Sequence, residues 1–181
     1  EAPAAPNGDE PCDMADLRGQ PRLRRAMEIA AAGGHHALLF GPPGVGKTMA
    51  ARRLVGLLPD LDDDDAIAVT TLHSLAGTLP DHACLIRRPP FRSPHHGASA
   101  EGIVGGGRSW KPGEISLAHA GVLRIDEAPE FRSDVLQALR EPLEAGKVTI
   151  VRADRVVSYP SRFMLVASCN PCPCGNLGRK G

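Results

Sequence analysis

The segment GPPGVGKT at residues 41–48 constrains the fold of this chain more than any other feature. It follows a short apolar run, 36–40, that predicts a buried strand, and it precedes a helix that we expect from Lys47 to about Leu58. Glycines at this spacing let successive backbone amides turn inward around a phosphate, next to the positive end of the helix. The segment therefore predicts a phosphate-binding loop between a strand and a helix.

The side chains of this loop suit a nucleoside triphosphate with its magnesium ion. The Lys47 ammonium reaches the β- and γ-phosphates, and the Thr48 hydroxyl is a magnesium ligand. The alternative, a glycine-rich turn with an incidental lysine, does not account for the strand and the helix on either side. We therefore expect ATP and Mg²⁺ to bind here, with contacts from Gly41, Pro42, Pro43, Gly44, Val45, Gly46, Lys47, Thr48 and Met49.

An acidic pair supplies the second magnesium anchor. The run Val122–Ile125 predicts a buried strand, and Asp126 and Glu127 stand at its end. Asp126 can hold Mg²⁺ through water, and Glu127 can take a proton from the attacking water. The alternative is a solvated turn after a strand, which the phosphate loop upstream disfavours. Arg124 interrupts the apolar run, and alternation places it opposite Ile125, on a sheet face covered by a helix end.

A third strand is predicted over 163–168, and Asn170 follows it. Because open α/β sheets bind ligands at the carboxyl ends of their strands, we expect Asn170 to hydrogen-bond the attacking water or the γ-phosphate. Asn-Pro is also ordinary turn chemistry, so this assignment depends on the two motifs upstream. Lys47, Glu127 and Asn170 are thus the predicted catalytic residues.

Composition and charge exclude several classes of protein. The 181 residues suit one domain by size, and 42% hydrophobic residues suffice for one core. The 21 basic and 21 acidic residues exclude a uniformly basic surface for nucleic acid, but not a local one. No apolar run is long enough to span a bilayer and no leader opens the chain, so we expect a cytoplasmic protein with no membrane partner.

The chain divides into a tail and one domain. Residues 1–15 lack periodicity and predict a flexible tail or linker before a domain over 16–181.

The acidic run 62–65 suits the start of a helix that continues to His73, with metal binding as the alternative. Residues 77–113 carry few structure signals, which is typical of a functional segment. The other predicted elements are a helix over 21–33, a helix over 133–143 capped by Ser133, and a hairpin of strands over 148–152 and 155–159.

Several segments carry a family resemblance. They are DLRGQ (16–20), GPPGVGKT (41–48), FRSPHH (91–96), PGEISLAHAGVLRIDEAPEF (112–131) and the run from Arg162 through NPCPCG (170–175). Together they resemble the magnesium-chelatase-like AAA+ ATPases, and within these the ComM/YifB group of bacterial proteins. The resemblance implies an α/β P-loop NTPase core with a five-stranded parallel sheet in the order 5-1-4-3-2, flanked by helices. It also implies an insertion over 85–120 and a pre-sensor hairpin over 147–159.

The same resemblance assigns the site residues to motifs. Lys47 and Thr48 match the Walker A motif, Asp126 and Glu127 match Walker B, and Asn170 matches sensor 1. Family members carry a Lon-protease-like domain before this region and a helical lid after it, so we expect the lid, the arginine finger and the sensor-2 arginine beyond the chain. A hexameric ring is expected of the full-length protein, whereas the fragment itself is expected to be monomeric and weakly active.

The substrate of such a ring is open between DNA and a protein partner. Members of the wider family drive metal into porphyrins or move DNA, and the ComM group is implicated in branch migration during natural transformation. Lys147, Arg152 and Arg155 give the predicted hairpin a basic character that suits DNA phosphates, although arginines on a loop are also often simply solvated. A chelatase-type motor that remodels a protein is the first alternative. A non-hydrolysing nucleotide-binding module is the second, and Glu127 argues against it.

Two clusters have possible metal chemistry. Cys172 and Cys174, with Cys169 nearby, are a possible half of a tetrahedral Zn²⁺ site, and the family resemblance implies that the remaining thiolate ligands would lie beyond Gly181 in the full-length protein. In the chain itself we expect reduced thiols. His95 and His96 are a possible metal pair, but adjacent histidines on a loop more often hydrogen-bond the backbone.

Overall fold

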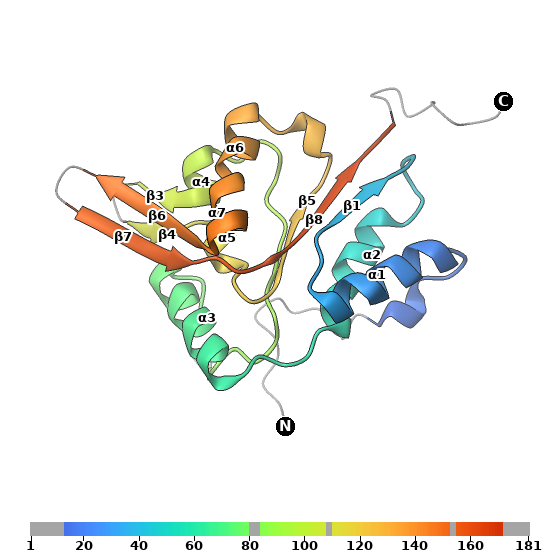
Figure 1. Cartoon of the computed structure of the whole chain (residues 1–181), viewed down its shortest axis with the longest axis horizontal. Coiled ribbons are helices and arrows are strands. Elements are labelled where there is room, and N and C mark those ends of the chain that lie inside the picture. Colours follow the sequence, from blue (N-terminus) through green and yellow to red (C-terminus); the bar gives the residue numbers. More distant parts are fainter. Residues whose placement is uncertain (1–12, 80–83, 108–109, 153–154, 172–181) are drawn as a thin grey trace.

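A parallel sheet of four strands forms the centre of the molecule (Figure 1). The computed structural model describes residues 13–79, 84–107, 110–152 and 155–171. The sheet order is β1-β8-β5-β2, which is the predicted order of strands 1, 4, 3 and 2. A fifth strand beside β1 is not among the described residues. The strands run over Ala37–Phe40 for β1, Met164–Cys169 for β8, Val122–Ile125 for β5 and Phe91–Arg92 for β2.

The register of the sheet divides its side chains between two faces. Arg124 pairs with Val166, and Leu39 pairs with Ser168. Because successive residues of a strand point to opposite faces, one face carries these four side chains and the other carries their neighbours in sequence. All four residues of β5 are buried, as expected for a strand that is covered on both sides.

Two helices pack on the face that carries Leu39 and Val166. The first, α1 (Pro21–Gly33), begins at a proline, whose missing N–H is not needed there, and ends at Gly34 with a φ of 63°. The second, α2 (Lys47–Leu54), continues into the 3₁₀ turn η2 (Val55–Leu57). Met27 of α1 and Leu54 of α2 are fully buried in this cluster.

The packed domain begins slightly before the predicted boundary at residue 16. A 3₁₀ turn, η1 (Met14–Asp16), precedes α1, and its Met14 side chain is 2% exposed. Met14 and Leu17 belong to the same hydrophobic cluster as α1 and α2. The predicted tail of residues 1–15 therefore contributes at least Met14 to the core, and residues 1–12 lie outside the described residues.

The acidic run starts a helix, as predicted. In α3 (Asp63–Ala76), the Asp62 side chain caps the first turn by accepting a hydrogen bond from the Asp65 N–H at 2.8 Å. The Asp65 carboxylate also accepts a hydrogen bond from the Arg162 guanidinium at 2.6 Å. Capping and ion pairing thus account for these acids, because carboxylates are favourable at the positive end of a helix.

The other face of the sheet is covered by short helices. They are α4 (Ala100–Val104), α5 (Glu114–Leu117), α6 (Ser133–Ala138) and α7 (Arg140–Ala145), and the 3₁₀ turn η3 (Ala128–Glu130) precedes α6. Ile103, Ile115 and Val135 from these helices are fully buried against Leu123 and Ile125 of β5. The central strands β5 and β8 therefore lie between two hydrophobic clusters, and a third, smaller cluster is formed by Leu61, Ala66, Val69 and Ile86.

The prediction of one helix over 133–143 capped by Ser133 was wrong in two respects. The segment forms two helices, and the residue at the N-cap of α6 is Arg132, without a side-chain capping bond. Pro142 explains the division, since it lies in the first turn of α7, where a missing N–H removes no helical hydrogen bond. Gly146, with a φ of 65°, ends α7 as predicted.

The stretch 77–113 is more structured than its sequence indicates. It contains β2 and α4, and the two short strands β3 (Gly105–Gly106) and β4 (Lys111–Pro112). Arg92 of β2 forms two hydrogen bonds of 2.7 Å with the Glu114 carboxylate at the start of α5. This paired contact joins two of the family-like segments. A two-residue strand such as β2 is too short for its periodicity to be seen in a sequence.

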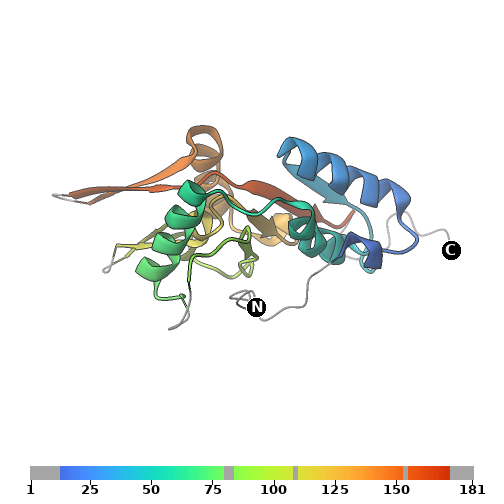
Figure 2. The same ribbon diagram turned by 90° about the horizontal axis from the view of Figure 1, so that it is seen from below.

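A long antiparallel hairpin extends from the body of the molecule, as predicted. It is formed by β6 (Lys147–Arg152) and β7 (Arg155–Pro160). Figures 1 and 2 show this hairpin at one end of the molecule and α1 at the other. Its base is anchored by the buried Val148 and by a hydrogen bond of 2.5 Å from the Tyr159 hydroxyl to the Trp110 carbonyl.

Candidate nucleotide-binding site

The predicted phosphate loop joins β1 to α2. Gly44 and Gly46 have φ angles of 84° and 91°, a backbone conformation that residues with side chains rarely adopt. A Cβ on Gly46 would also lie 3.3 Å from Leu17 Cδ1. The path of the loop therefore requires glycine at both positions. It ends at the N-terminus of α2, where backbone N–H groups and the helix dipole favour an anion.

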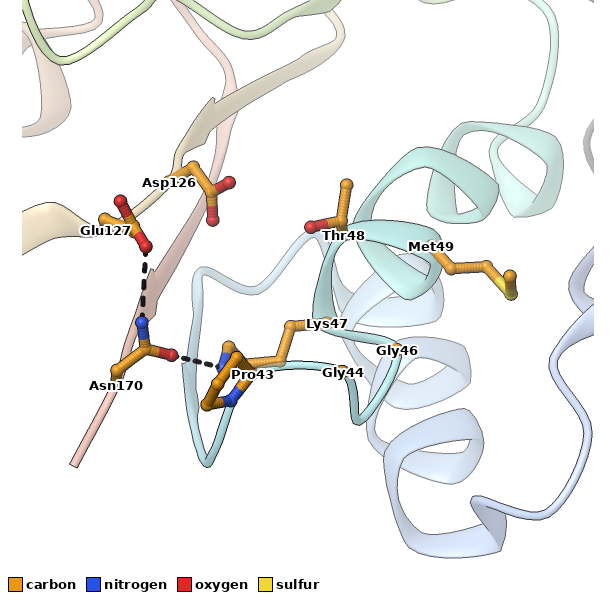
Figure 3. Close-up of a pocket in the computed structure, with 9 residues that line it drawn as sticks. All are labelled: Pro43, Gly44, Gly46, Lys47, Thr48, Met49, Asp126, Glu127 and Asn170. Carbon is orange, nitrogen blue, oxygen red and sulfur yellow. Dashed lines mark hydrogen bonds between the residues drawn. The ribbon is translucent and has the colours of Figure 1, made fainter. Parts of the chain in front are cut away.

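The Lys47 ammonium lies over this loop. Its Nζ donates hydrogen bonds to the carbonyl oxygens of Gly41 and Pro42, the second at 3.0 Å. It also donates to Asn170 Oδ1 at 2.9 Å (Figure 3). A lysine ammonium has three donors, and all three are used within the site. The positive charge is thus held between the loop and the end of β8.

Asn170 connects the lysine to the acidic pair. Its Nδ2 donates to Glu127 Oε1 at 3.3 Å, while its Oδ1 accepts from Lys47 (Figure 3). Glu127 has a φ of 50°, which is uncommon for a residue with a side chain. Such backbone strain clusters at functional sites, where the surrounding structure holds it in place. The hydrogen bond to Asn170 makes Glu127 and Asn170 a pair at the carboxyl ends of β5 and β8.

Asp126 is held from two sides. Its Oδ1 accepts a hydrogen bond from the Ser168 hydroxyl, and its Oδ2 pairs with the Arg124 guanidinium. Burial raises the pKa of Asp126, but the Ser168 hydrogen bond and the Arg124 charge together outweigh burial and lower that pKa below its usual value. Asp126 is therefore a carboxylate at neutral pH.

These groups surround one cavity of about 310 Å³. That volume lies at the lower end of the range for small-molecule sites, about 300–1,000 Å³. Figure 3 shows Asp126 facing Thr48 across the cavity, with the Met49 side chain pointing away from the acidic groups. The cavity is lined by Pro43, Gly44, Gly46, Lys47, Thr48, Met49, Asp126, Glu127 and Asn170.

The cavity brings together residues predicted from three separate segments. Lys47 and Asn170, which are in direct contact, are 123 positions apart in the chain. Gly41, Pro42 and Val45 belong to the predicted contact set but do not line the cavity. Gly41 and Pro42 instead supply the carbonyls that bind the lysine.

The donor set of the cavity suits magnesium. Thr48 contributes a hydroxyl oxygen and Asp126 a carboxylate, and Mg²⁺ prefers oxygen ligands of this kind together with water and substrate phosphates. Glycine conformations that only a side-chain-free residue tolerates form the adjoining phosphate cradle. The residues present therefore fit a magnesium–nucleotide complex.

Two residues at this site were not assigned to it from the sequence. Side chains alternate between the two faces along β8, and this alternation puts Ser168 on the face where its hydroxyl donates a hydrogen bond to Asp126. Arg124 lies on the face opposite Ile125 and contacts Thr48, in the first turn of α2, so its predicted place against a helix end is confirmed. The signal for Arg124 was available, since a single cation in an apolar strand has to find a buried partner.

The structure separates the basic residues predicted to contact DNA. Arg152 and Arg155 are opposite each other at the tip of the hairpin. Lys147 lies at the base, five residues from Arg152 along β6, which is about 17 Å at the usual rise of a strand. Lys147 and Arg155 are exposed. Only the two arginines can therefore act together at the tip.

The possible metal clusters outside the cavity find no support. Cys172 and Cys174 lie outside the described residues. Within the described ranges, no group of three or more histidine, cysteine or acidic side chains is placed to hold a metal ion. His95 accepts a hydrogen bond from the backbone N–H of Gly97 at 3.1 Å, which is the alternative considered for the histidine pair. In the same part of the chain, no helix is both long and apolar enough to cross a membrane.

The sequence matches a known protein family over almost its whole length. Residues 13–181 match the family described as magnesium chelatase, subunit ChlI. An uncharacterized protein of Mycobacterium tuberculosis is 53% identical over 163 residues, which are 90% of this chain and 32% of that protein. The uncharacterized protein YifB of Escherichia coli is 51% identical over 164 residues, 91% of this chain and 32% of YifB. The competence protein ComM of Haemophilus influenzae is 50% identical over 171 residues, 94% of this chain and 33% of ComM.

The chain thus spans about a third of the length of these relatives. Among solved structures, a chain of the complex between subunits BchI and BchD of magnesium chelatase superposes with a TM-score of 0.69 and 25% identity. The superposition covers 90% of this chain and 56% of that one. NtrX from Brucella abortus, solved with ADP, gives a TM-score of 0.58 at 18% identity over 90% of this chain and 33% of NtrX. The predicted AAA+ α/β core is confirmed by this likeness.

Proposed function

The chain belongs to the magnesium chelatase family, and from that premise and the geometry of its cavity we propose that it binds and hydrolyses ATP as the motor core of a ring ATPase. One observation carries the proposal. Lys47 and Thr48 from the phosphate loop, Asp126 and Glu127 after β5, and Asn170 after β8 converge on a single cavity. A cation, a magnesium donor set and an acid–amide pair are the groups that phosphoryl transfer to water needs.

Binding uses the loop and its lysine. The amides of the loop and the N-terminus of α2 accept the triphosphate, and Lys47 exchanges its contacts with the neutral carbonyls of Gly41 and Pro42 for anionic phosphate oxygens. The ammonium is a charged donor in both states, and an anionic acceptor in place of a neutral carbonyl adds direct attraction between opposite charges, so this exchange favours binding. Thr48 and Asp126 would hold Mg²⁺, which neutralises and orients the β- and γ-phosphates when it is bound.

Hydrolysis uses the pair at the ends of β5 and β8. Glu127 takes a proton from a water molecule as the water oxygen attacks the γ-phosphorus, and the bond from that phosphorus to the bridging oxygen breaks to give ADP and phosphate. Asn170 lies 3.3 Å from Glu127 and 2.9 Å from Lys47. These contacts support the proposal that its amide orients the water or the γ-phosphate.

The test of this role separates binding from turnover. Glu127→Gln keeps the size of the side chain but removes its basicity, so the variant should bind ATP as the natural protein does while its turnover falls at least about a hundredfold, in the range of a lost general base. The assay measures phosphate release by the full-length protein and ATP binding by the same sample. Turnover that is retained in the full-length variant would remove the base role from Glu127.

We further propose that the full-length protein forms a hexameric ring that moves DNA, with Arg152 and Arg155 at the hairpin tip touching the phosphates and Lys147 contributing at the base. Two facts support this. A relative with 50% identity carries the name of a competence protein, and the hairpin extends away from the core with its arginines at the tip. Arginines neutralise phosphates and release counterions, so binding of this kind weakens as salt rises.

A chelatase-type motor that remodels a protein partner is the second candidate. It is favoured by the TM-score of 0.69 to a chain from a complex of two magnesium chelatase subunits. DNA separates the two candidates. If duplex or branched DNA neither binds the full-length protein at low salt nor stimulates its ATP hydrolysis, the DNA proposal fails and the protein-remodelling role stands.

A further inference from the structure

Arg124 occupies an unusual place in the cavity wall. It lies in the strand that ends at the acidic pair, it is 5% exposed, and its Nη2 donates to Thr48 Oγ1 at 2.8 Å. The same nitrogen pairs with Asp126 Oδ2. One nitrogen of one guanidinium therefore bridges the hydroxyl and the carboxylate that make up the protein's magnesium donor set.

The remaining contacts of this guanidinium are weak. Its Nη1 donates to Ser93 Oγ at the long distance of 3.3 Å. Its Nε is buried and has no hydrogen-bond partner within the described structure. A buried donor without a partner is unfavourable. Thr48 and Asp126 therefore fix the position of the Arg124 guanidinium, whose other nitrogen atoms lack strong hydrogen bonds.

A guanidinium and a magnesium ion compete for these oxygens. Mg²⁺ requires near-octahedral oxygen ligands at close range, and a guanidinium has donors only, so it cannot serve as a ligand. Two cations also repel each other at this separation, most strongly where water is excluded. The bridge to Thr48 and Asp126 therefore has to open before the two side chains can serve a metal ion.

We propose that Arg124 is a resident cation of the magnesium site, which holds Thr48 and Asp126 in place and which Mg²⁺ has to displace. Arg124 thereby raises the Mg²⁺ concentration at which the chain binds a magnesium–nucleotide complex. The Ser93 hydroxyl, exposed just after β2, offers the displaced guanidinium an acceptor on the side away from Thr48. The inference deepens the proposed ATP-binding function and rests on it.

The test measures the metal requirement of binding. Arg124→Met removes the charge and keeps a long apolar side chain. We measure the affinity of a fluorescent ADP analogue for the natural chain and the variant, first in EDTA and then over a titration of Mg²⁺. The Mg²⁺ concentration for half of the metal-dependent gain in affinity should fall about tenfold in the variant, equivalent to about 1.4 kcal/mol. The affinity in EDTA should not rise.

A matched control uses another arginine near the cavity. Arg53 lies on the same helix as Thr48 and pairs with Asp16 at 3.0 Å, outside the cavity wall. Arg53→Met should leave the Mg²⁺ requirement unchanged. A requirement that is unchanged or higher in Arg124→Met would overturn the proposal. Arg124→Lys, which keeps a cation without the planar fork, should give a smaller decrease, and it serves as the test if the methionine variant does not fold.

A second measurement keeps the proposal separate from the proposed function. Mn²⁺ binding without nucleotide, followed by electron paramagnetic resonance, should be stronger in Arg124→Met than in the natural chain. If neither protein binds the ADP analogue, ATP binding is refuted while the Mn²⁺ comparison still decides whether Arg124 competes with a metal. If both bind the analogue and Mn²⁺ binding is equal, only the role of Arg124 is refuted.

Discussion

The cavity and the hairpin organise their charged residues in opposite ways. The cavity joins side chains that are far apart in the chain, such as Lys47 and Asn170, 123 positions apart yet 2.9 Å from each other. The hairpin carries three basic residues within nine positions, but its register puts Lys147 at one end and the two arginines at the other. Parallel strands bring distant residues to a common edge, whereas a hairpin spreads neighbouring residues along its length.

The two regions also differ in burial. The strand that ends at the acidic pair is covered on both faces, and every residue of β5 is buried. β1, which leads into the phosphate loop, is covered on one face only, and its Leu38 and Phe40 are 66% and 68% exposed. On the hairpin, Val151 and Val156 are cross-strand partners that remain 69% and 66% exposed. The acidic pair thus follows a strand that is buried throughout, whereas the surface proposed to bind DNA lies on a hairpin whose facing valines are exposed.

Stability should show this difference most strongly. Leu123, fully buried in β5, contacts the cluster formed by the short helices. Leu123→Ala should lower the free energy of unfolding by about 2–5 kcal/mol, because it removes buried methyl groups and leaves a cavity. Val156→Ala on the hairpin should change it by less than about 0.5 kcal/mol. Urea denaturation of both variants measures the contrast, and equal losses would contradict the account of where the core lies.

Nucleotide binding should depend on the cavity and not on the hairpin. Lys47→Ala removes the one lysine among the described residues that line the cavity. It should weaken ATP binding at least about a hundredfold, the loss of about 2.7 kcal/mol expected for a charged hydrogen bond to phosphate. Arg155→Glu should leave that affinity within twofold, about 0.4 kcal/mol. Isothermal titration with ATP and Mg²⁺ compares the two, and undiminished affinity in Lys47→Ala would remove the phosphate loop from the account.

The cavity could be predicted from the sequence because its residues belong to strongly local patterns. The loop 41–48 and the acidic pair after Ile125 each combine an apolar strand with chemistry at its end, and the topology of a parallel sheet then brings the ends together. The contact of Asn170 with both Lys47 and Glu127 agrees with its placement at a third strand end.

Other features depended on tertiary contacts that no local pattern carries. β2 consists of only two residues and forms because Phe91 and Arg92 pair with β5. The division of the helix at 133–143 is different, because its signal, Pro142 in a new first turn, is present in the local sequence. The competition of Arg124 for Thr48 joins residues 76 positions apart, so the sequence indicated a buried arginine but not its partner.

The DNA proposal predicts the largest effect on DNA affinity at the tip of the hairpin. Arg152→Glu combined with Arg155→Glu in the full-length protein should reduce the slope of log affinity against log salt by about 2, since each phosphate contact contributes about 0.9. Lys147→Glu, at the base, should have a smaller effect. Fluorescence anisotropy with a branched DNA at several salt concentrations provides the measurement, and a slope that is unaltered in the double variant would contradict a contact at the tip.

The smallest predicted effect concerns two buried histidines of the core. Burial lowers the pKa of His73 and of His119 below the usual value. The unfolded chain takes up protons at these residues below about pH 6.5, while the folded chain does not, so the free energy of unfolding falls as the pH drops from 7 toward 5. His73→Gln should make this fall shallower, whereas the exposed His96→Gln should not. Urea denaturation at pH 7 and pH 5.5 measures the free energy of unfolding of each protein. If that free energy falls by the same amount between the two pH values in His73→Gln and in the natural protein, the role of His73 is refuted.

The most direct test of the central claim is a crystal structure of this chain with Mg²⁺ and a non-hydrolysable ATP analogue. We expect the β- and γ-phosphates within hydrogen-bond distance of Lys47 Nζ, the metal ion bound by the Thr48 hydroxyl, and Glu127 and Asn170 facing the γ-phosphate. Phosphates bound elsewhere on the protein, with Lys47 still on the carbonyls of Gly41 and Pro42, would contradict it.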